Sequence, residues 1–187
     1  MDIFKEAKKA YEDCINDLKM VSDMMANLAQ KSGLRYKKTD LLAQFDVLLQ
    51  YSLLQAALAD NHLDLSEVQF IHDITQYGDY CSFLEAKTGE HVDWFQIYQS
   101  PEKLIKTLVD GSRNAVEDLA TDFYVFFTMF DAETPYDYFR DLKNNITLIH
   151  VVLMHADGEM SFAEKSTPTL LMNILYQIAE KLGKSFN

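Results

Sequence analysis

Residues that break helices or cross-link a chain are scarce in this 187-residue sequence. Glycine occurs six times, proline three times and cysteine twice. So little glycine and proline excludes collagen-like and low-complexity chains and favours helix. Two cysteines without a Cys-x-x-Cys motif cannot form a zinc knuckle. Because Cys14 and Cys81 both lie in apolar helical stretches, we expect them to be buried, reduced thiols.

Basic charge and long apolar runs are also limited. The chain has 17 Lys and Arg against 29 Asp and Glu, a net charge of −12. A surface that acidic repels phosphate backbones, so we expect no nucleic-acid role. The longest apolar run, residues 123–130, is too short to span a bilayer, and residues 1–13 lack the apolar core of a secretory signal. We therefore expect a cytoplasmic protein without membrane insertion.

The spacing of apolar residues predicts an all-α protein. Apolar positions recur every three or four residues, and no useful stretch alternates with period two. We predict one domain, residues 1–187, with about seven to nine helices. The expected segments are 2–30 (amphipathic), 40–59 (apolar on nearly all sides), 64–77 (closed by Gly78), short helices in 79–99 split at Thr88-Gly89, a short helix from Ser100-Pro101 to Asp110-Gly111, 112–130, 135–155 (also nearly all apolar) and 161–182.

One bend is written twice, as LADNHLDLSEV at residues 58–68 and as HADGEMSFAEK at residues 155–165. In both copies an apolar helix runs into the bend and a mixed helix runs out. At a constant offset of 97 residues the matched pairs are Leu42 with Phe139, Phe45 with Leu142, Leu49 with Ile146, Leu54 with Val151, Asp60 with Asp157, Asn61 with Gly158, Leu63 with Met160 and Glu67 with Glu164. The repeat predicts two pseudo-symmetric helical halves, packed so that the apolar helix of each is central.

Most positions of the bend have a structural explanation. Asn61 and Gly158 are residue types that tolerate the left-handed backbone that ends a helix. Asp64 followed by Glu67 is a capping box, in which the cap side chain accepts from the third N–H and the glutamate reaches back. Ser161 followed by Glu164 repeats the pattern.

The first aspartate of each bend has no such explanation. Asp60 and Asp157 each lie near the C-terminal end of the incoming helix, where the helix dipole disfavours negative charge. A residue placed twice against local preference suggests a function, although an Asx-type turn is a structural alternative. The functional alternatives are docking of a partner and binding of a divalent cation. The candidate metal ligands are Asp60, Asp64 and Glu67 in the first bend and His155, Asp157, Glu159 and Glu164 in the second.

The two bends resemble the TerB-like family, named for the tellurite-resistance protein TerB. Its signature is a helix ending in Ala-Asp-Gly, a short gap and a Glu that opens the next helix. Residues 156–158 and Glu164 fit this signature, and residues 59–61 with Glu67 depart from it by Asn61 in place of Gly. The resemblance covers about residues 38–182 and leaves the N-terminal helix 2–30 as an addition. It implies an all-α fold of two halves, divalent-cation binding at acidic residues, and a role in stress or tellurite resistance.

No known catalytic motif occurs in the chain, so we expect a protein that is not an enzyme and needs no cofactor other than a divalent cation. We expect an unidentified protein partner, and a homodimer is left open. The alternative from another class is a metal-dependent enzyme that uses Asp157, Glu164 and His155. A third hypothesis is a pocket for an apolar ligand lined by Phe83, Trp94 and Phe95.

Overall fold

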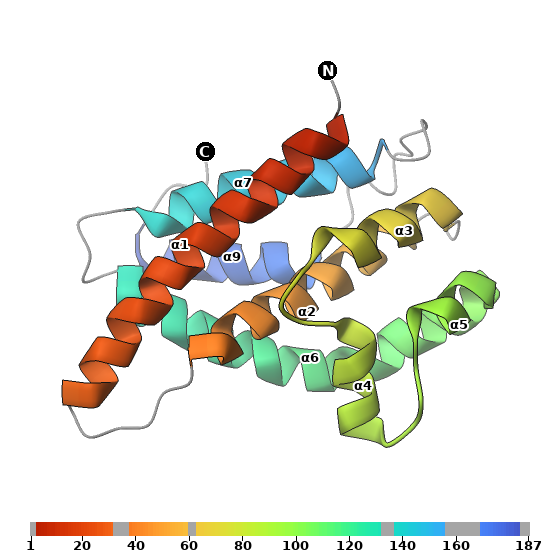
Figure 1. Cartoon of the computed structure of the whole chain (residues 1–187), viewed down its shortest axis with the longest axis horizontal. Helices are drawn as coiled ribbons and strands as arrows, with labels where there is room; N and C mark the ends of the chain where they lie inside the picture. The colour runs from red at the N-terminus through yellow and green to blue at the C-terminus, as the bar shows by residue number, and fades with distance from the viewer. Residues whose placement is uncertain (1–2, 32–37, 60–62, 132–136, 156–168, 184–187) are drawn as a thin grey trace.

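The computed structural model describes residues 3–31, 38–59, 63–131, 137–155 and 169–183. These residues form eight helices and no strand, which confirms the predicted all-α class (Figure 1). One continuous hydrophobic core takes side chains from every helix. The helices are α1 (Ile3–Lys31), α2 (Lys38–Ala57), α3 (Leu65–Ile74), α4 (Tyr80–Thr88), α5 (Trp94–Gln99), α6 (Glu102–Asp131), α7 (Tyr138–Leu153) and α9 (Leu170–Lys181).

Helix α2 lies at the centre of the fold, as its apolar composition predicts. Figure 1 shows α2 crossing the middle of the molecule, with α1 and α7 side by side along one flank and α6 along the other. Helices α3, α4 and α9 also pack on α2. Its apolar side chains therefore meet neighbours on every side, and Phe45, Leu49 and Leu54 have no exposed surface.

Helix α7, the counterpart of α2 in the repeat, is buried on one face only. The first three matched pairs from the two helices are buried in both members. At the fourth pair the two helices differ, because Leu54 is fully buried whereas Val151 is 36 % exposed. Leu148 is also exposed on α7. Because α7 packs mainly against α1 and α9 at the edge of the molecule, it keeps a solvent face that α2 lacks.

The predicted break at Asp110-Gly111 is wrong, since α6 is one helix of 30 residues. Gly111 lies on its exposed side, and a Cβ there would meet nothing within 4 Å. A glycine inside a helix costs about 1 kcal/mol relative to alanine. The buried stripe through Val109, Ser112 and Val116 continues across this position, so packing on the core holds the helix together.

The connection after α3 also differs from the prediction. The expected helix 64–77 ends at Ile74, because the next residues turn towards α2. Gly78 lies so close to α2 that a Cβ at this position would be 2.3 Å from the carbonyl oxygen of Ala43. The predicted split at Thr88-Gly89 is confirmed: Gly89 closes α4 with a φ of 73°, which glycine adopts without steric cost.

Two further predictions concern the thiols and the membrane. Cys14 and Cys81 are buried and free, as expected. None of the helices that the structure describes is long and apolar enough to cross a membrane.

Candidate functional site

The first bend leads into α3 through the predicted capping box. Asp64 is the N-cap, and its Oδ1 accepts a hydrogen bond of 2.7 Å from the Ser66 backbone N–H. In return, Glu67 Oε2 accepts a bond of 2.8 Å from the Asp64 backbone N–H. Glu67 is only 2 % exposed, so it acts from inside the fold. The structural explanation of these two carboxylates is therefore confirmed.

The start of α6 meets the start of α3 at this bend. The Leu63 backbone N–H donates to Glu102 Oε1 at 3.4 Å, which ties the residue before the cap of α3 to the first residue of α6. A groove of about 310 Å³ lies beside this contact and is lined by Leu63, Leu65, Val68, Ile97, Tyr98, Ser100, Pro101, Glu102 and Ile105. We call it the α3–α5–α6 groove. Most of the described lining residues are apolar, and among them Glu102 carries a carboxylate.

The other candidate metal ligands are only partly described. Asp60, Asp157, Glu159 and Glu164 lie outside the described residues. His155 is exposed, and its Nδ1 lies 2.7 Å from the carbonyl oxygen of Val151 in its own helix. In the described segments, no group of three or more His, Cys, Asp or Glu is placed to hold a metal ion. A cation site that includes the first aspartates of the bends therefore stays a prediction.

His150 links α7 to α9 on the side of the second bend. It is 8 % exposed, with Nδ1 3.0 Å from the Ile146 carbonyl oxygen and Nε2 3.5 Å from Thr169 Oγ1. Thr169 is the N-cap of α9 and accepts from the Met172 N–H. Burial lowers the pKa of His150. The neutral ring therefore donates from Nδ1 to its own helix and accepts from Thr169 through Nε2.

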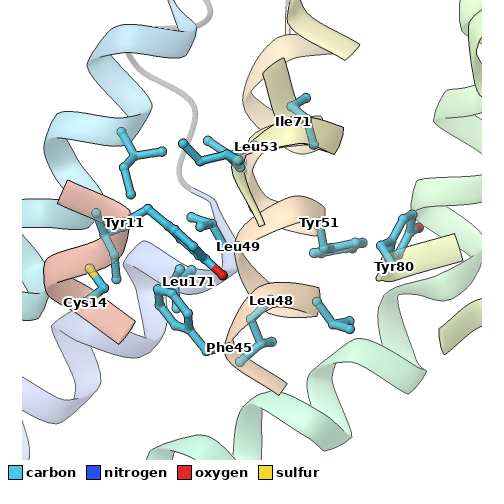
Figure 2. Close-up of a cluster of buried hydrophobic side chains, with 14 of the residues drawn as sticks. Tyr11, Cys14, Phe45, Leu48, Leu49, Tyr51, Leu53, Ile71, Tyr80 and Leu171 are labelled. Atoms are coloured by element: carbon cyan, nitrogen blue, oxygen red, sulfur yellow. The ribbon is translucent and has the colours of Figure 1, made fainter. Parts of the chain in front are cut away.

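Sequence reasoning missed the polar residues inside α2. Asp46 is fully buried and accepts from the backbone N–H groups of Gln76, Tyr77 and Gly78 at 3.1, 2.6 and 3.0 Å. The Tyr11 hydroxyl, which reaches from α1 towards α2 in Figure 2, lies 3.0 Å from both Asp46 oxygens. Burial raises the pKa of Asp46, and these donors oppose that rise. Burial, followed by the Asp46 charge, also raises the pKa of Tyr11, so its hydroxyl stays a donor.

Further along α2, three more polar side chains bind other segments. Gln50 Oε1 accepts from the Tyr80 N–H at 2.7 Å, at the start of α4. Figure 2 shows the Tyr51 and Tyr80 rings facing each other between α2 and α4. Their centroids lie 5.8 Å apart. Ser52 Oγ and Gln55 Oε1 accept from the first N–H groups of α9, at 3.0 and 2.8 Å. The sequence contains a signal for these contacts, because these polar residues interrupt a helix that is otherwise apolar.

A polar groove of about 360 Å³ between α1 and α7 is lined by Asp13, Asn16, Asp17, Asp141, Asn144 and Asn145. Burial raises the pKa of Asp17, and Asp141 and Asp13 add to the rise.

In the aromatic middle, Trp94 is buried and its indole N–H donates to Asp79, whereas Phe95 is 66 % exposed. Neighbouring rings that face core and solvent do not form one pocket wall, which argues against the predicted apolar-ligand pocket.

Comparison with known proteins adds no relative. No protein family, curated protein or solved structure matches the chain.

Proposed function

We propose that the chain is a non-enzymatic helical protein of the TerB-like type that binds a protein partner at its first acidic bend. One observation carries the proposal: the capped start of α3 and the start of α6 form a braced acidic corner beside an apolar groove. Such a corner offers a partner both charge and apolar area on a fixed backbone.

The use of the buried polar groups supports a binding protein rather than an enzyme. Asp46, Gln50, Ser52 and Gln55 each accept hydrogen bonds from the backbone of another segment. Their oxygens hold loops and helix ends in place. A catalytic site instead needs a nucleophile or base that faces a substrate.

A divalent cation is the second candidate ligand, suggested by the repeated aspartates of the bends. Calorimetric titration of metal-free protein with Ca²⁺, Mg²⁺, Mn²⁺ and Zn²⁺ tests it, alongside Asp60→Asn and Asp157→Asn. Micromolar binding that either variant loses would make the bends cation sites and would revive the metal-dependent enzyme as an alternative. No heat from any of the four ions would leave partner binding as the function.

Partner binding is tested by photo-crosslinking in the cells that make the protein. A photoreactive amino acid replaces Leu65, which is 62 % exposed on the first turn of α3. The matched control carries it in place of Tyr176, which is 52 % exposed on α9. We expect a discrete crosslinked protein from position 65 alone. Equal crosslinking from both positions, or none from position 65, would contradict the proposal.

The TerB-like resemblance suggests stress or tellurite resistance as the setting. Cells that lack the protein should then grow less well in tellurite than cells with the intact gene. An Asp64→Lys variant, which reverses the charge at that one position of the bend, should fail to restore growth.

A further inference from the structure

We infer that the partner at the first bend is a second copy of this chain, which docks about a twofold axis on the surface around the α3–α5–α6 groove. This inference rests on the proposed function, which places a protein partner there, and it names that partner. The apolar side chains around the groove, the charges beside them and an unfavourably placed lysine carry it.

The surface around the groove exposes a group of large apolar side chains. Leu65, Phe95 and Leu104 are 62, 66 and 60 % exposed, more than any other large apolar side chain in the described part of the chain. Leu65 lines the groove itself. Phe95 lies one turn of α5 before the lining residue Tyr98. Leu104 lies one turn after the lining residue Pro101, and its N–H donates to the Pro101 carbonyl oxygen at 2.8 Å.

We call Leu65, Phe95 and Leu104 the apolar rim of the groove. Figure 1 shows α5 and the first turns of α3 and α6 at the same end of the molecule. Exposed apolar side chains are normal when they are scattered singly, whereas a group at one place marks a surface that another molecule covers. Covering the rim would remove this apolar area from water.

The charges beside the apolar rim have both signs. Glu102 and Lys103 are neighbours in the first turn of α6, and Lys106 follows one turn later. Asp64 caps α3 on the other side of the groove. A surface with both signs can face a copy of itself, because rotation about a twofold axis brings acidic groups of one copy opposite basic groups of the other.

The polar groove between α1 and α7 shows the opposite case. Its charged lining residues are Asp13, Asp17 and Asp141, and none of the lining residues that the structure describes is basic. Two copies that met there would repel each other. The net charge of −12 makes the chain as a whole repel a second copy in the same way. Self-association is therefore favoured at a surface that carries lysines as well as acids, such as the apolar rim.

Lys103 is placed against the electrostatic preference of its own helix. It lies in the first turn of α6, where the helix dipole disfavours a positive charge. Within the described segments, its ammonium group has no hydrogen bond or ion pair that offsets this cost. A carboxylate from a second copy would supply a partner for this charge.

The test is the oligomeric state of the purified full-length protein and of two matched pairs of variants. Sedimentation velocity from about 1 to 100 μM resolves dimers of moderate affinity. Leu104→Glu changes the apolar rim, and its control is Leu148→Glu, at a leucine that is 37 % exposed on α7. Lys103→Glu leaves the first turn of α6 with acidic charge only, and its control is Lys181→Glu, at an exposed lysine of α9. Within each pair the net charge changes equally, so general repulsion between copies grows equally.

We expect a dimer in the parent protein, self-association weakened at least about tenfold in Leu104→Glu and Lys103→Glu, and little change in the two controls. The Leu104 and Lys103 side chains are exposed, so neither variant disturbs the core, and circular dichroism checks that both are folded.

Three outcomes would overturn the inference. They are a monomer at every concentration, equal effects of a variant and its control, or a dimer that neither Leu104→Glu nor Lys103→Glu weakens. The crosslinking experiment separates the two proposals. A product of twice the chain mass from position 65 would support both. A product with a different protein, together with a monomeric pure protein, would reject only the second copy, whereas no product from position 65 and a monomeric pure protein would reject both.

Discussion

Gly78→Ala should be one of the most damaging small substitutions in this protein. The added Cβ would lie 2.3 Å from the Ala43 carbonyl oxygen, 2.9 Å from its Cα and 3.0 Å from its carbonyl carbon. All three atoms are backbone atoms of α2, so no side chain can rotate away. The loop would have to move, and the Gly78 N–H would lose its bond to Asp46. We expect a loss of about 3 kcal/mol, the upper end of the usual range for overpacking.

Gly111→Ala is the matched control, because a Cβ there meets nothing within 4 Å. It should stabilise α6 by about 1 kcal/mol through helix propensity. Thermal unfolding followed by circular dichroism should then show a fall of about 6–12 °C for Gly78→Ala and a rise of about 2–4 °C for Gly111→Ala. Both changes restrict the unfolded chain similarly, so their difference isolates the close contact. A Gly78→Ala variant that melts at or above the parent temperature would refute the reasoning.

Three further predictions concern buried and exposed ionisable groups. Asp46→Ala should cost at least about 3 kcal/mol in urea unfolding, because the Tyr77 and Gly78 backbone N–H groups lose their acceptor and the Gln76 N–H keeps only the Tyr11 hydroxyl. Tyr11→Phe should cost about 1 kcal/mol, and similar losses in the two variants would show that the backbone bonds to Asp46 are not formed. The pKa of His150 is lowered from 6.5, so the unfolded chain binds more protons below that pH and stability falls on acidification by up to about 1.4 kcal/mol per pH unit. The free energy of unfolding in urea, measured between about pH 7.5 and 5, should show this loss on acidification in the parent and not in His150→Gln. The same pH dependence in both proteins would exclude a buried neutral His150 ring. The pKa of exposed His91 lies above 6.5 because its ring is hydrogen-bonded to Glu85 and, as the second cause, to Asp93. An NMR titration of Glu85→Gln should therefore show a lower His91 pKa than the parent. An unchanged pKa would mean that the His91–Glu85 contact does not persist in solution.

Features that depend on neighbouring residues were predictable from the sequence. The capping box of Asp64 and Glu67 is one, because the two residues lie three positions apart and an Asp followed by Glu at this spacing is a typical capping pair. The central position of α2 is another, because a helix that is apolar all round must be covered all round. The split at Gly89 followed from a glycine in the left-handed conformation.

Features that depend on distant contacts were not predictable. The sequence predicts a helix end at Gly111, but the packing of α6 on α2 in the core outweighs the low helix propensity of glycine. Asp46 reads as an ordinary polar interruption, since its backbone donors lie 30 to 32 residues further along the chain. The candidate site shows the same division. The caps of the first bend were predicted, and the meeting of α3 with α6 through Glu102 was not, because 39 residues separate its partners.

The acceptors that α2 provides for α9 also bear on how the chain is made. Ser52 and Leu171 are separated by 119 residues, and Gln55 and Leu170 by 115. During synthesis, which proceeds at about 5–20 residues per second, α2 leaves the ribosome seconds before α9 exists. Through that interval the face of α2 that α9 will cover has only water or a chaperone as its neighbour. A ribosome that stalled before residue 170 would therefore display an apolar, incomplete α2, a form that chaperones and proteases recognise.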